Sequence, residues 1–289
     1  MEIIRQLDLS DLIRRALAED VGQGDITTAA TVASGQTGKA VITVKEPEGI
    51  VFCGGMMIEQ VFAMTGSVPV IKSLADEGAR LKNGAIATEI EGRLAGLLMG
   101  ERTALNFVQL MSGIATATRR YVDAVAGTRA KIIDTRKTHP GLRAIEKYGV
   151  RAGGGTNHRF GLDSGVLIKE NHIAAAGGIR NALEGARRLA PHTLRIQIEC
   201  ERLGQIEEAV KHGATAILLD NMSLAEMRHA RQIVGDAIIL EASGGVTLET
   251  VHAIAETGVD LISVGALTHS VKAVDLSMRI LSAQITRSC

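Results

Sequence analysis

The chain has 289 residues, of which 46% are hydrophobic and 22% charged, and its 32 basic and 32 acidic side chains give a formal net charge of zero. A neutral chain with two Tyr, four Phe and no Trp lacks the basic surface and the stacking side chains typical of nucleic-acid-binding proteins. Three scattered cysteines predict neither a disulfide framework nor a zinc site. Without a recognisable signal peptide or an apolar run of about 20 residues, we expect a cytoplasmic protein with no membrane partner.

The first ninety residues predict a small α/β unit. Apolar residues at helical spacing over 9–18, with a serine and an aspartate available as N-caps, predict a first helix. The alternating run GKAVITVK (38–45) predicts a strand that 49–52 continues. Residues 68–90 offer further short strands separated by glycine-containing turns.

A long amphipathic helix should follow. An apolar stripe at helical spacing runs from Leu94 to Met111. The pair Ser112-Gly113 predicts a break in this helix, and a second helix should run on toward Val125. Arg102 lies on the first of these helices, where spacing alone favours a surface arginine paired with a neighbouring acid.

After residue 130, short β-branched or Leu-rich runs alternate with helix-like segments. This alternation indicates parallel strands joined by right-handed crossovers. Most of the predicted strands end in a charged or small polar residue, which is typical of an active site at the C-terminal ends of α/β-barrel strands. A doubly wound sheet would carry a glycine fingerprint at its first turn, and the sequence has none. The predicted strands are residues 131–134, 166–169, 195–199, 216–220, 237–241 and 261–264.

The number of these repeats bounds the architecture. Six of them occupy about 135 residues, whereas a complete eight-fold barrel needs roughly 250. The barrel should therefore be incomplete and should leave strand edges that another domain or subunit must cover. This is a physical reason to expect an oligomer.

One segment, residues 131–172, is strongly basic within the neutral chain. It has eight Lys and Arg against four Asp and Glu. A local cationic site in a neutral chain indicates a small, highly charged anion as ligand, because a nucleic acid or a membrane would favour a basic surface over the whole domain. The residues grouped around its run of three glycines are Arg136, Lys137, His158, Arg159 and Lys169.

Eight motifs in one order extend over nearly the whole chain. They are EDVGQGDITT (19–28), GERTALNFVQLMSGIAT (100–116), DTRKTHPGLR (134–143), GGGTNHRFGL (153–162), LIKENH (167–172), LLDN (218–221), EASGGV (241–246) and ISVGALTHS (262–270). With these motifs the chain resembles the quinolinate phosphoribosyltransferases, type II phosphoribosyltransferases that are also called carboxylating nicotinate-nucleotide pyrophosphorylases.

This resemblance implies an α/β fold of two domains. An N-terminal α/β sandwich is expected over 1–112, and a C-terminal incomplete, open α/β barrel over 113–289. The last helix of the chain is expected to pack back on the N-terminal domain. The resemblance also implies a homodimer with shared active sites, or a higher homo-oligomer.

The implied activity is transfer of a phosphoribosyl group from phosphoribosyl pyrophosphate (PRPP) to quinolinate, with decarboxylation. The products are nicotinate mononucleotide, pyrophosphate and CO₂, in de novo NAD biosynthesis. The two substrates together carry about seven negative charges, so the site must supply several cations. Arginine forks two hydrogen bonds to a planar carboxylate, while lysine acts as a point charge on phosphate.

The resemblance assigns the basic residues to these two substrates. The residues implied to hold quinolinate are Arg136, His158, Arg159 and Lys169. Lys137 and Lys169 are implied to reach the pyrophosphate and to act in catalysis. Arg102 is implied to enter the substrate site of the neighbouring subunit. Taken alone, Arg136 and Lys137 are also compatible with residues that cap a strand and face water.

Two carboxylates complete the expected catalytic group. Glu199 and Asp220 end consecutive predicted strands, so we expect them side by side at the barrel mouth. Two carboxylates next to bound phosphates suit Mg²⁺, held directly or through substrate or water, and they would also bind the ribose hydroxyls and stabilise an oxocarbenium-like centre. The family usually has a second glutamate where this chain has Gln197, which alternation places on the same face as Glu199. A purely structural pair is the alternative.

Two glycine-containing turns are expected to bind the 5′-phosphate of PRPP. Ser243, Gly244 and Gly245 follow one predicted strand, and Gly265 follows the last. Backbone N–H groups exposed in such turns make a phosphate pocket. The resemblance places His269 nearby. Glycine could instead serve only to permit a tight turn.

Three other functions stay open from the sequence. One is a paralogous pyrophosphorylase-like protein of the same fold that acts on another base. A second is a Schiff-base aldolase that uses Lys169 as its nucleophile. The third is a non-catalytic module that binds a phosphorylated metabolite without releasing pyrophosphate.

Overall fold

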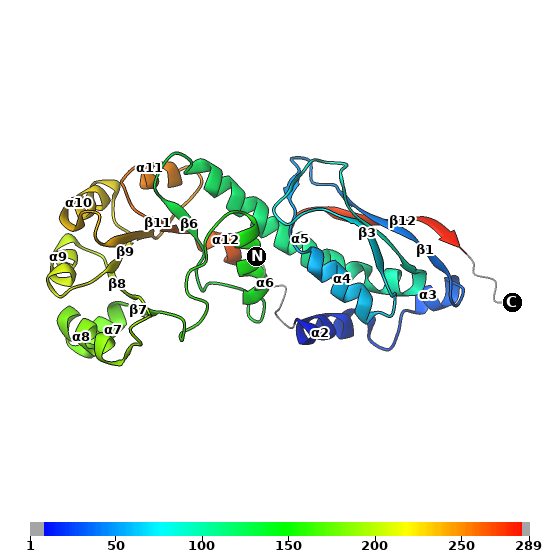
Figure 1. Ribbon diagram of the computed structural model, residues 1–289, viewed down its shortest axis with the longest axis horizontal. Helices are drawn as coiled ribbons and strands as arrows, with labels where there is room; N and C mark the ends of the chain where they lie inside the picture. The colour runs from blue at the N-terminus through cyan, green and yellow to red at the C-terminus, as the bar shows by residue number, and fades with distance from the viewer. Residues whose placement is uncertain (1–8, 285–289) are drawn as a thin grey trace. The chain divides into compact units, whose positions relative to one another are not determined.

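The computed structural model describes residues 9–284 and divides into two compact units (Figure 1). The first unit combines three separate segments, Met1–Ala117, Pro140–Gly154 and Val271–Cys289. The second unit is formed by Thr118–His139 and Gly155–Ser270. Of the region expected to form the barrel, residues 113–117, Pro140–Gly154 and Val271–Cys289 therefore belong to the first unit.

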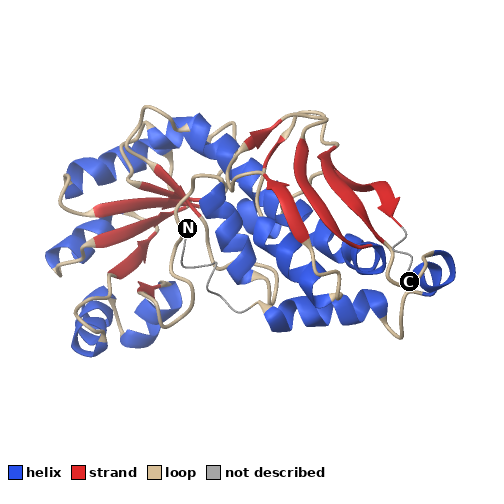
Figure 2. Ribbon diagram, turned by 45° about the vertical axis from the view of Figure 1, so that its right-hand side comes forward, coloured by secondary structure: helices blue, strands red, loops and turns tan. Residues whose placement is uncertain are grey.

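The first unit is a two-layer α/β sandwich built on a four-stranded sheet (Figure 2). Its strands run in the order β12-β1-β5-β3, and a short pair, β2 with β4, lies outside this sheet. The apolar side chains of one sheet face pack against helices α4 and α5 to form the core. The strands are β1 (Thr37–Val44), β2 (Ile50–Val51), β3 (Val70–Leu74), β4 (Arg80–Leu81), β5 (Ile86–Arg93) and β12 (Leu276–Gln284). The helices are α2 (Ser10–Val21), α3 (Ile26–Thr31), α4 (Gly55–Met64), α5 (Leu94–Ala124) and α6 (Arg143–Ala152).

The C-terminal segment is a strand, and the expected last helix is therefore wrong. Strand β12 pairs antiparallel with β1, with Leu276 opposite Val44. Leu276 is buried, and Met278 and Ile280 pack against the core of the first unit. This alternation of inward and outward side chains has the period of a strand, which is why the segment pairs with the sheet edge.

Helix α5 is continuous, so the break expected at Ser112-Gly113 is also wrong. The Ser112 hydroxyl donates to the carbonyl oxygen of Cys53 at 3.1 Å and accepts from the Cys53 N–H at 2.9 Å, so it does not disrupt its own helix. Gly113 lies against the backbone of Lys272, and a Cβ there would collide with the Lys272 carbonyl oxygen. The glycine serves close packing between two chain segments, not helix termination.

The second unit contains a six-stranded sheet in the order β6-β11-β10-β9-β8-β7, with all neighbours parallel (Figures 1 and 2). No pairing joins β6 to β7 within residues 9–284, so the sheet does not close, which confirms an incomplete α/β barrel. The strands are β6 (Lys131–Ile133), β7 (Val166–Ile168), β8 (Ile196–Cys200), β9 (Ala216–Asp220), β10 (Ile239–Ser243) and β11 (Leu261–Ser263). The helices are α7 (Glu170–Ala176), α8 (Ile179–Leu189), α9 (Leu203–Lys211), α10 (Leu224–Val234), α11 (Val251–Ala255) and α12 (Ala266–His269).

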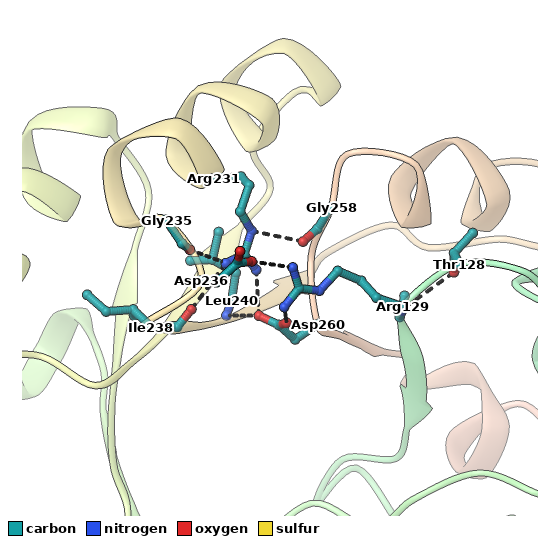
Figure 3. A network of polar contacts seen from close by, with 10 residues as sticks. Thr128, Arg129, Arg231, Gly235, Asp236, Ile238, Leu240, Gly258 and Asp260 are labelled. Atoms are coloured by element: carbon teal, nitrogen blue, oxygen red, sulfur yellow. Dashed lines mark hydrogen bonds and ion pairs between the residues drawn. The ribbon is translucent and has the colours of Figure 1, made fainter.

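A polar network fixes the N-terminal ends of β10 and β11 (Figure 3). Asp260, just before β11, accepts a hydrogen bond from the backbone N–H of Leu240 at 2.9 Å. The same carboxylate forms ion pairs with Arg231 of α10 and with Arg129, which precedes β6. These contacts lie at the opposite end of the strands from the C-terminal ends that carry the predicted site, so we assign them to stability.

Candidate active site

The C-terminal ends of the parallel strands gather most of the predicted site residues within the second unit. Lys169 follows β7, Glu199 lies near the end of β8, and Asp220 is the last residue of β9. Ser243 is the last residue of β10, and Arg136 follows β6 closely. Because all these strands point the same way, their ends meet at one edge of the sheet.

Lys169 and Glu199 are brought into direct contact. The Lys169 ammonium group lies 2.9 Å from Oε2 of Glu199, whose side chain is buried, while half of the lysine side chain is exposed. The backbone N–H of Lys169 donates to Nδ1 of His172 at 3.0 Å, which holds the start of helix α7. The lysine is therefore paired with a buried acid, and the exposed part of its side chain is available to a ligand.

Asp220 lies further toward the barrel mouth than Glu199. In the strand register Glu199 is opposite Leu218, so Asp220 is two residues beyond it, about 6–7 Å along the strand direction. Oδ2 of Asp220 accepts a hydrogen bond from the Asn221 amide at 2.9 Å. Both carboxylates lie on the same face of the sheet, but at different levels along the strands. This differs from the side-by-side arrangement expected from the sequence.

A second pair of buried polar side chains lies deeper in the barrel. The Gln197 amide donates to Oε2 of Glu241 at 2.7 Å, and both side chains are buried. Burial raises the pKa of the Glu241 carboxyl, the hydrogen bond from Gln197 and the nearby Ser263 hydroxyl oppose this rise, and the nearby charges of Asp134 and Glu199 add to it. The Ser263 hydroxyl itself donates to the carbonyl oxygen of Ala242 at 3.2 Å. The sequence places Glu241 with Ser243 at the end of a predicted strand, among the functional residues of the barrel mouth, but it assigns Glu241 no role in binding or catalysis.

A buried aspartate organises the NHR motif. Oδ1 of Asp134 accepts from the backbone N–H of His158 at 2.8 Å, and Oδ2 accepts from the Asn157 amide at 2.5 Å. The adjacent Arg159 donates from Nη1 to the carbonyl oxygen of Gly165 at 2.8 Å. The sequence places Asp134 at the end of a predicted strand beside Arg136 and Lys137, but it predicts neither its hold on the NHR motif nor a role for Asn157.

Arg159 and Arg136 act on each other electrostatically. Partial burial lowers the pKa of the Arg159 guanidinium, and the positive charge of Arg136 lowers it further. Two guanidinium groups close enough to repel each other form a local site for an anion, because a bound anion would relieve the repulsion.

A pocket of about 190 Å³ lies inside the second unit. It brings the NHR motif together with Gln197 and Glu241. The strands add apolar side chains to its wall, most of them the first residues of their strands, and Arg195, just before β8, adds a further cation. The polar residues of its lining include Asn157, His158, Arg159, Gln197 and Glu241.

The two expected phosphate turns require glycine for different reasons. Gly244 has a φ of +98°, and a Cβ there would collide with the side chain of Asn221. A Cβ at Gly265 would lie 3.0 Å from Nε2 of His269 and 3.4 Å from the side chain of Lys137. The turn after β11 is thus packed against His269 and Lys137, and the Thr268 hydroxyl adds a hydrogen bond to the Lys137 carbonyl at 2.8 Å. Gly245, with a φ of +58°, completes the first turn.

Arg102 lies on α5, in the first unit, with an exposed side chain. Its expected role in the site of a neighbouring subunit stays a prediction. Within residues 9–284, no group of three or more His, Cys, Asp or Glu side chains is arranged to hold a metal ion. None of the helices in this range is both long and apolar enough to cross a membrane.

Comparison with known proteins assigns the chain to a family over nearly its whole length. Models described as the N-terminal and C-terminal domains of quinolinate phosphoribosyl transferase match residues 25–112 and 114–279. A probable carboxylating nicotinate-nucleotide pyrophosphorylase of Bacillus subtilis is 43% identical, over 99% of this chain and 98% of its own. The carboxylating nicotinate-nucleotide pyrophosphorylase of Mycobacterium leprae is 44% identical, over 93% of this chain and 95% of its own.

A solved structure leads to the same family. The nicotinate-nucleotide pyrophosphorylase of Francisella tularensis superposes with a TM-score of 0.90 at 36% identity, covering 96% of this chain and 99% of its own. The open parallel sheet, the site residues at its C-terminal edge and the full-length similarity all agree. The chain belongs to the quinolinate phosphoribosyltransferase family.

Proposed function

We propose that the protein transfers the phosphoribosyl group of PRPP to the ring nitrogen of quinolinate and releases pyrophosphate and CO₂, forming nicotinate mononucleotide. The observation that carries this proposal is the contact between Lys169 and Glu199 at the C-terminal end of the barrel strands, in the same unit as Arg136 and Arg159. This contact holds together Lys169, a cation that can bind substrate, and Glu199, a carboxylate that can stabilise positive charge on the ribose. Full-length similarity to proteins named for this reaction supports it.

For quinolinate, we assign Arg136 and Arg159 to the two carboxylates, because a guanidinium matches a carboxylate through two parallel hydrogen bonds. Lys169 adds a third cation. The ring of His158 shapes the pocket, since Nδ1 accepts the backbone N–H of Arg159 and Nε2 is directed toward Glu241. The dianion would offset the repulsion between the two arginines.

For PRPP, we assign Lys137 and Lys169 to the pyrophosphate and the two glycine turns to the 5′-phosphate. Lys137 packs against Gly265, and His269 packs against the same glycine, so these groups can meet one ligand. The first turn offers Ser243, Gly244 and Gly245 at the end of β10. Exposed backbone N–H groups and a hydroxyl suit phosphate oxygens.

We assign Glu199 and Asp220 to the ribose. As pyrophosphate leaves, positive charge develops at the ribose C1 and is stabilised by carboxylates fixed in advance. The protein supplies orientation and electrostatic stabilisation and needs no covalent nucleophile. After transfer, the positive ring nitrogen stabilises the carbanion left at C2 when the adjacent carboxylate departs as CO₂.

Mg²⁺ fits this site as a companion of PRPP. Glu199 and Asp220 offer carboxylate oxygens at two levels along the strands. Gln197 contributes no charge because its side chain is a neutral amide, and this amide donates to Glu241. Two carboxylates are too few for a closed protein site but suit an ion that is shared with substrate phosphates. When bound there, Mg²⁺ would neutralise phosphate charge.

We further propose a homodimer, or a higher homo-oligomer built from it, in which Arg102 enters the neighbouring subunit's site. The incomplete barrel supports this arrangement, because its edges need cover. The exposed side chain of Arg102 is available for such a contact. We expect the protein to work in the cytoplasm, with small-molecule substrates as its ligands.

One assay tests the function. Purified protein is incubated with PRPP, Mg²⁺ and quinolinate carrying labelled carbon in its 2-carboxylate, and pyrophosphate and labelled CO₂ are measured together. We expect equal amounts of both. PRPP binding without pyrophosphate release would favour the binding module, and pyrophosphate release only with another base would favour the paralogous function. Borohydride trapping of a carbonyl substrate on Lys169 would favour an aldolase, which the ion pair of that lysine with Glu199 disfavours.

A further inference from the structure

A buried carboxyl group lies next to the residues assigned to quinolinate. Glu241 is the third residue of β10 and only 1% of it is exposed. Its Oε2 is held by the amide of Gln197 at 2.7 Å. Both residues line the pocket that His158 and Arg159 also line. Nothing in the assigned chemistry of PRPP or quinolinate uses this carboxyl.

The hydrogen bonds of His158 direct its ring toward this carboxyl. Nδ1 of His158 accepts the backbone N–H of Arg159 at 2.7 Å, which leaves the ring proton on Nε2. Nε2 lies 3.7 Å from Oε2 of Glu241, the same oxygen that Gln197 holds. The Gln197 amide thus donates to this oxygen, and the Nε2–H of His158 is directed toward it at a distance longer than a direct hydrogen bond. The negative end of the carboxyl therefore favours this orientation of the imidazole.

The other carboxyl oxygen points to a second link. Oε1 of Glu241 and Nε of Arg159 are both buried, and neither has a hydrogen-bond partner among the described residues. Both residues line the same pocket, whose volume of about 190 Å³ leaves room for water. Buried polar atoms are almost always paired, and an ordered water satisfies such groups at little cost. A water in this pocket can join Arg159 to Glu241.

We propose that Glu241 is a positioning residue for quinolinate, which fixes the His158 ring through Oε2 and the Arg159 guanidinium through a water at Oε1. This inference rests on the proposed function, which assigns His158 and Arg159 to the quinolinate pocket. Oε2 can accept the hydrogen bond from Gln197 and attract the Nε2–H of His158 whether or not the carboxyl carries a proton on Oε1. The role therefore depends on the shape and hydrogen bonding of the carboxyl and not on its charge.

Two variants separate this role from a general loss of structure. Glu241→Ala removes the acceptor, whereas Glu241→Gln keeps an oxygen for Gln197 and His158 and places an amide where Oε1 was. We expect Glu241→Ala to raise KM for quinolinate at least about tenfold, with KM for PRPP within about twofold of the wild type. We expect Glu241→Gln to stay within about threefold of the wild type for both substrates.

Asp260→Ala is the matched control. It removes another largely buried acid of the same unit, at the opposite end of the strands. It should lower the melting temperature without a selective change in KM for quinolinate. A double variant with His158→Ala then tests the connection, since the two effects should be less than multiplicative if Glu241 acts through His158.

Three results would overturn the inference while the wild type remains active: an unchanged KM for quinolinate in Glu241→Ala, an equal rise in both KM values, or fully multiplicative effects with His158→Ala. An inactive wild type would instead refute the proposed function. If Glu241→Ala does not fold, Gln197→Leu provides the test, because it removes only the donor to Oε2. That variant should also raise KM for quinolinate and not for PRPP. A KM for quinolinate equal to that of the wild type would again overturn the inference.

Discussion

At the residue scale, acids inside the barrel hold the cations of the candidate site in place. Glu199 pairs with Lys169, and Asp134 holds the backbone from which Arg159 projects. Two arginines that repel each other and a lysine already paired with an acid make a site with a local excess of positive charge in a neutral chain. The electrostatic work of bringing these cations together is done on folding, so an anionic substrate finds them already oriented.

The first prediction concerns the carboxylates that face the ribose. Glu199→Ala and Asp220→Ala should each lower kcat by at least about a hundredfold with smaller changes in KM, because the lost interaction is realised in the transition state. Steady-state kinetics with both substrates varied measures this. Glu201→Ala, which removes an exposed acid just beyond β8, should keep wild-type kinetics. Near wild-type kcat in both test variants would remove these residues from the mechanism.

The second prediction concerns selectivity for quinolinate over nicotinate, which lacks the 2-carboxylate. Nicotinate would leave the partly buried Arg159 without its carboxylate partner, and losing a hydrogen bond to a charged group costs about 1.5–3 kcal/mol. Since each 1.4 kcal/mol is about tenfold, kcat/KM for nicotinate should be lower by roughly one to two orders of magnitude. Arg159→Ala should narrow this gap by harming quinolinate more. Similar kcat/KM values for both acids in the wild type would contradict the dicarboxylate assignment.

Residues at the strand ends could be located from the sequence, whereas the contacts that they make deeper in the barrel could not. Lys169, Glu199 and Asp220 follow apolar runs, and the ends of parallel strands necessarily meet at one edge. Glu241 lies in the middle of a strand, where its pairing with Gln197 depends on which strands are neighbours. The hold of Asp134 on the NHR motif depends on loop geometry, which hydrophobic periodicity does not describe.

At the element scale, long-range packing decided where local preference failed. The parallel strands were predictable because each is an apolar run between helical patterns. Helix α5 continues through Ser112-Gly113 because the serine bonds to Cys53 and the glycine admits the backbone of Lys272. Strand β12 becomes a strand because the edge of β1 is available to it. These partners are distant in sequence, so local sequence patterns could predict neither the continuous helix nor the C-terminal strand.

The third prediction compares two glycines within helices. Gly113→Ala in α5 should destabilise the protein by about 1–3 kcal/mol, because the added methyl group meets a backbone carbonyl that cannot move freely. Gly185→Ala in α8 meets nothing within 4 Å and should be neutral or stabilising by up to about 1 kcal/mol, because alanine favours the helix. Urea unfolding of both variants measures the difference. Equal free energies of unfolding would show that the close approach to Lys272 carries no cost.

At the scale of the whole molecule, an open barrel leaves the site dependent on what covers it. Within the described residues, the six-stranded sheet has two unpaired edges, at β6 and β7. The site residues at its strand ends all belong to the second unit. A second copy of the chain can cover such edges and supply a missing cation at once. The homodimer proposed above would meet both needs.

The last prediction tests this assembly through catalysis. Arg102→Ala and Lys137→Ala should each be nearly inactive alone, because each removes a cation from every site. Mixed dimers formed by subunit exchange would contain one site with both substitutions and one site with neither, if Arg102 enters the neighbouring subunit's site. Mixing equal amounts should therefore restore up to about a quarter of wild-type activity, since half of the dimers are mixed and each has one intact site. Exchange is followed independently with two affinity tags. Demonstrated exchange without any recovery would place Arg102 in its own subunit's site or outside catalysis.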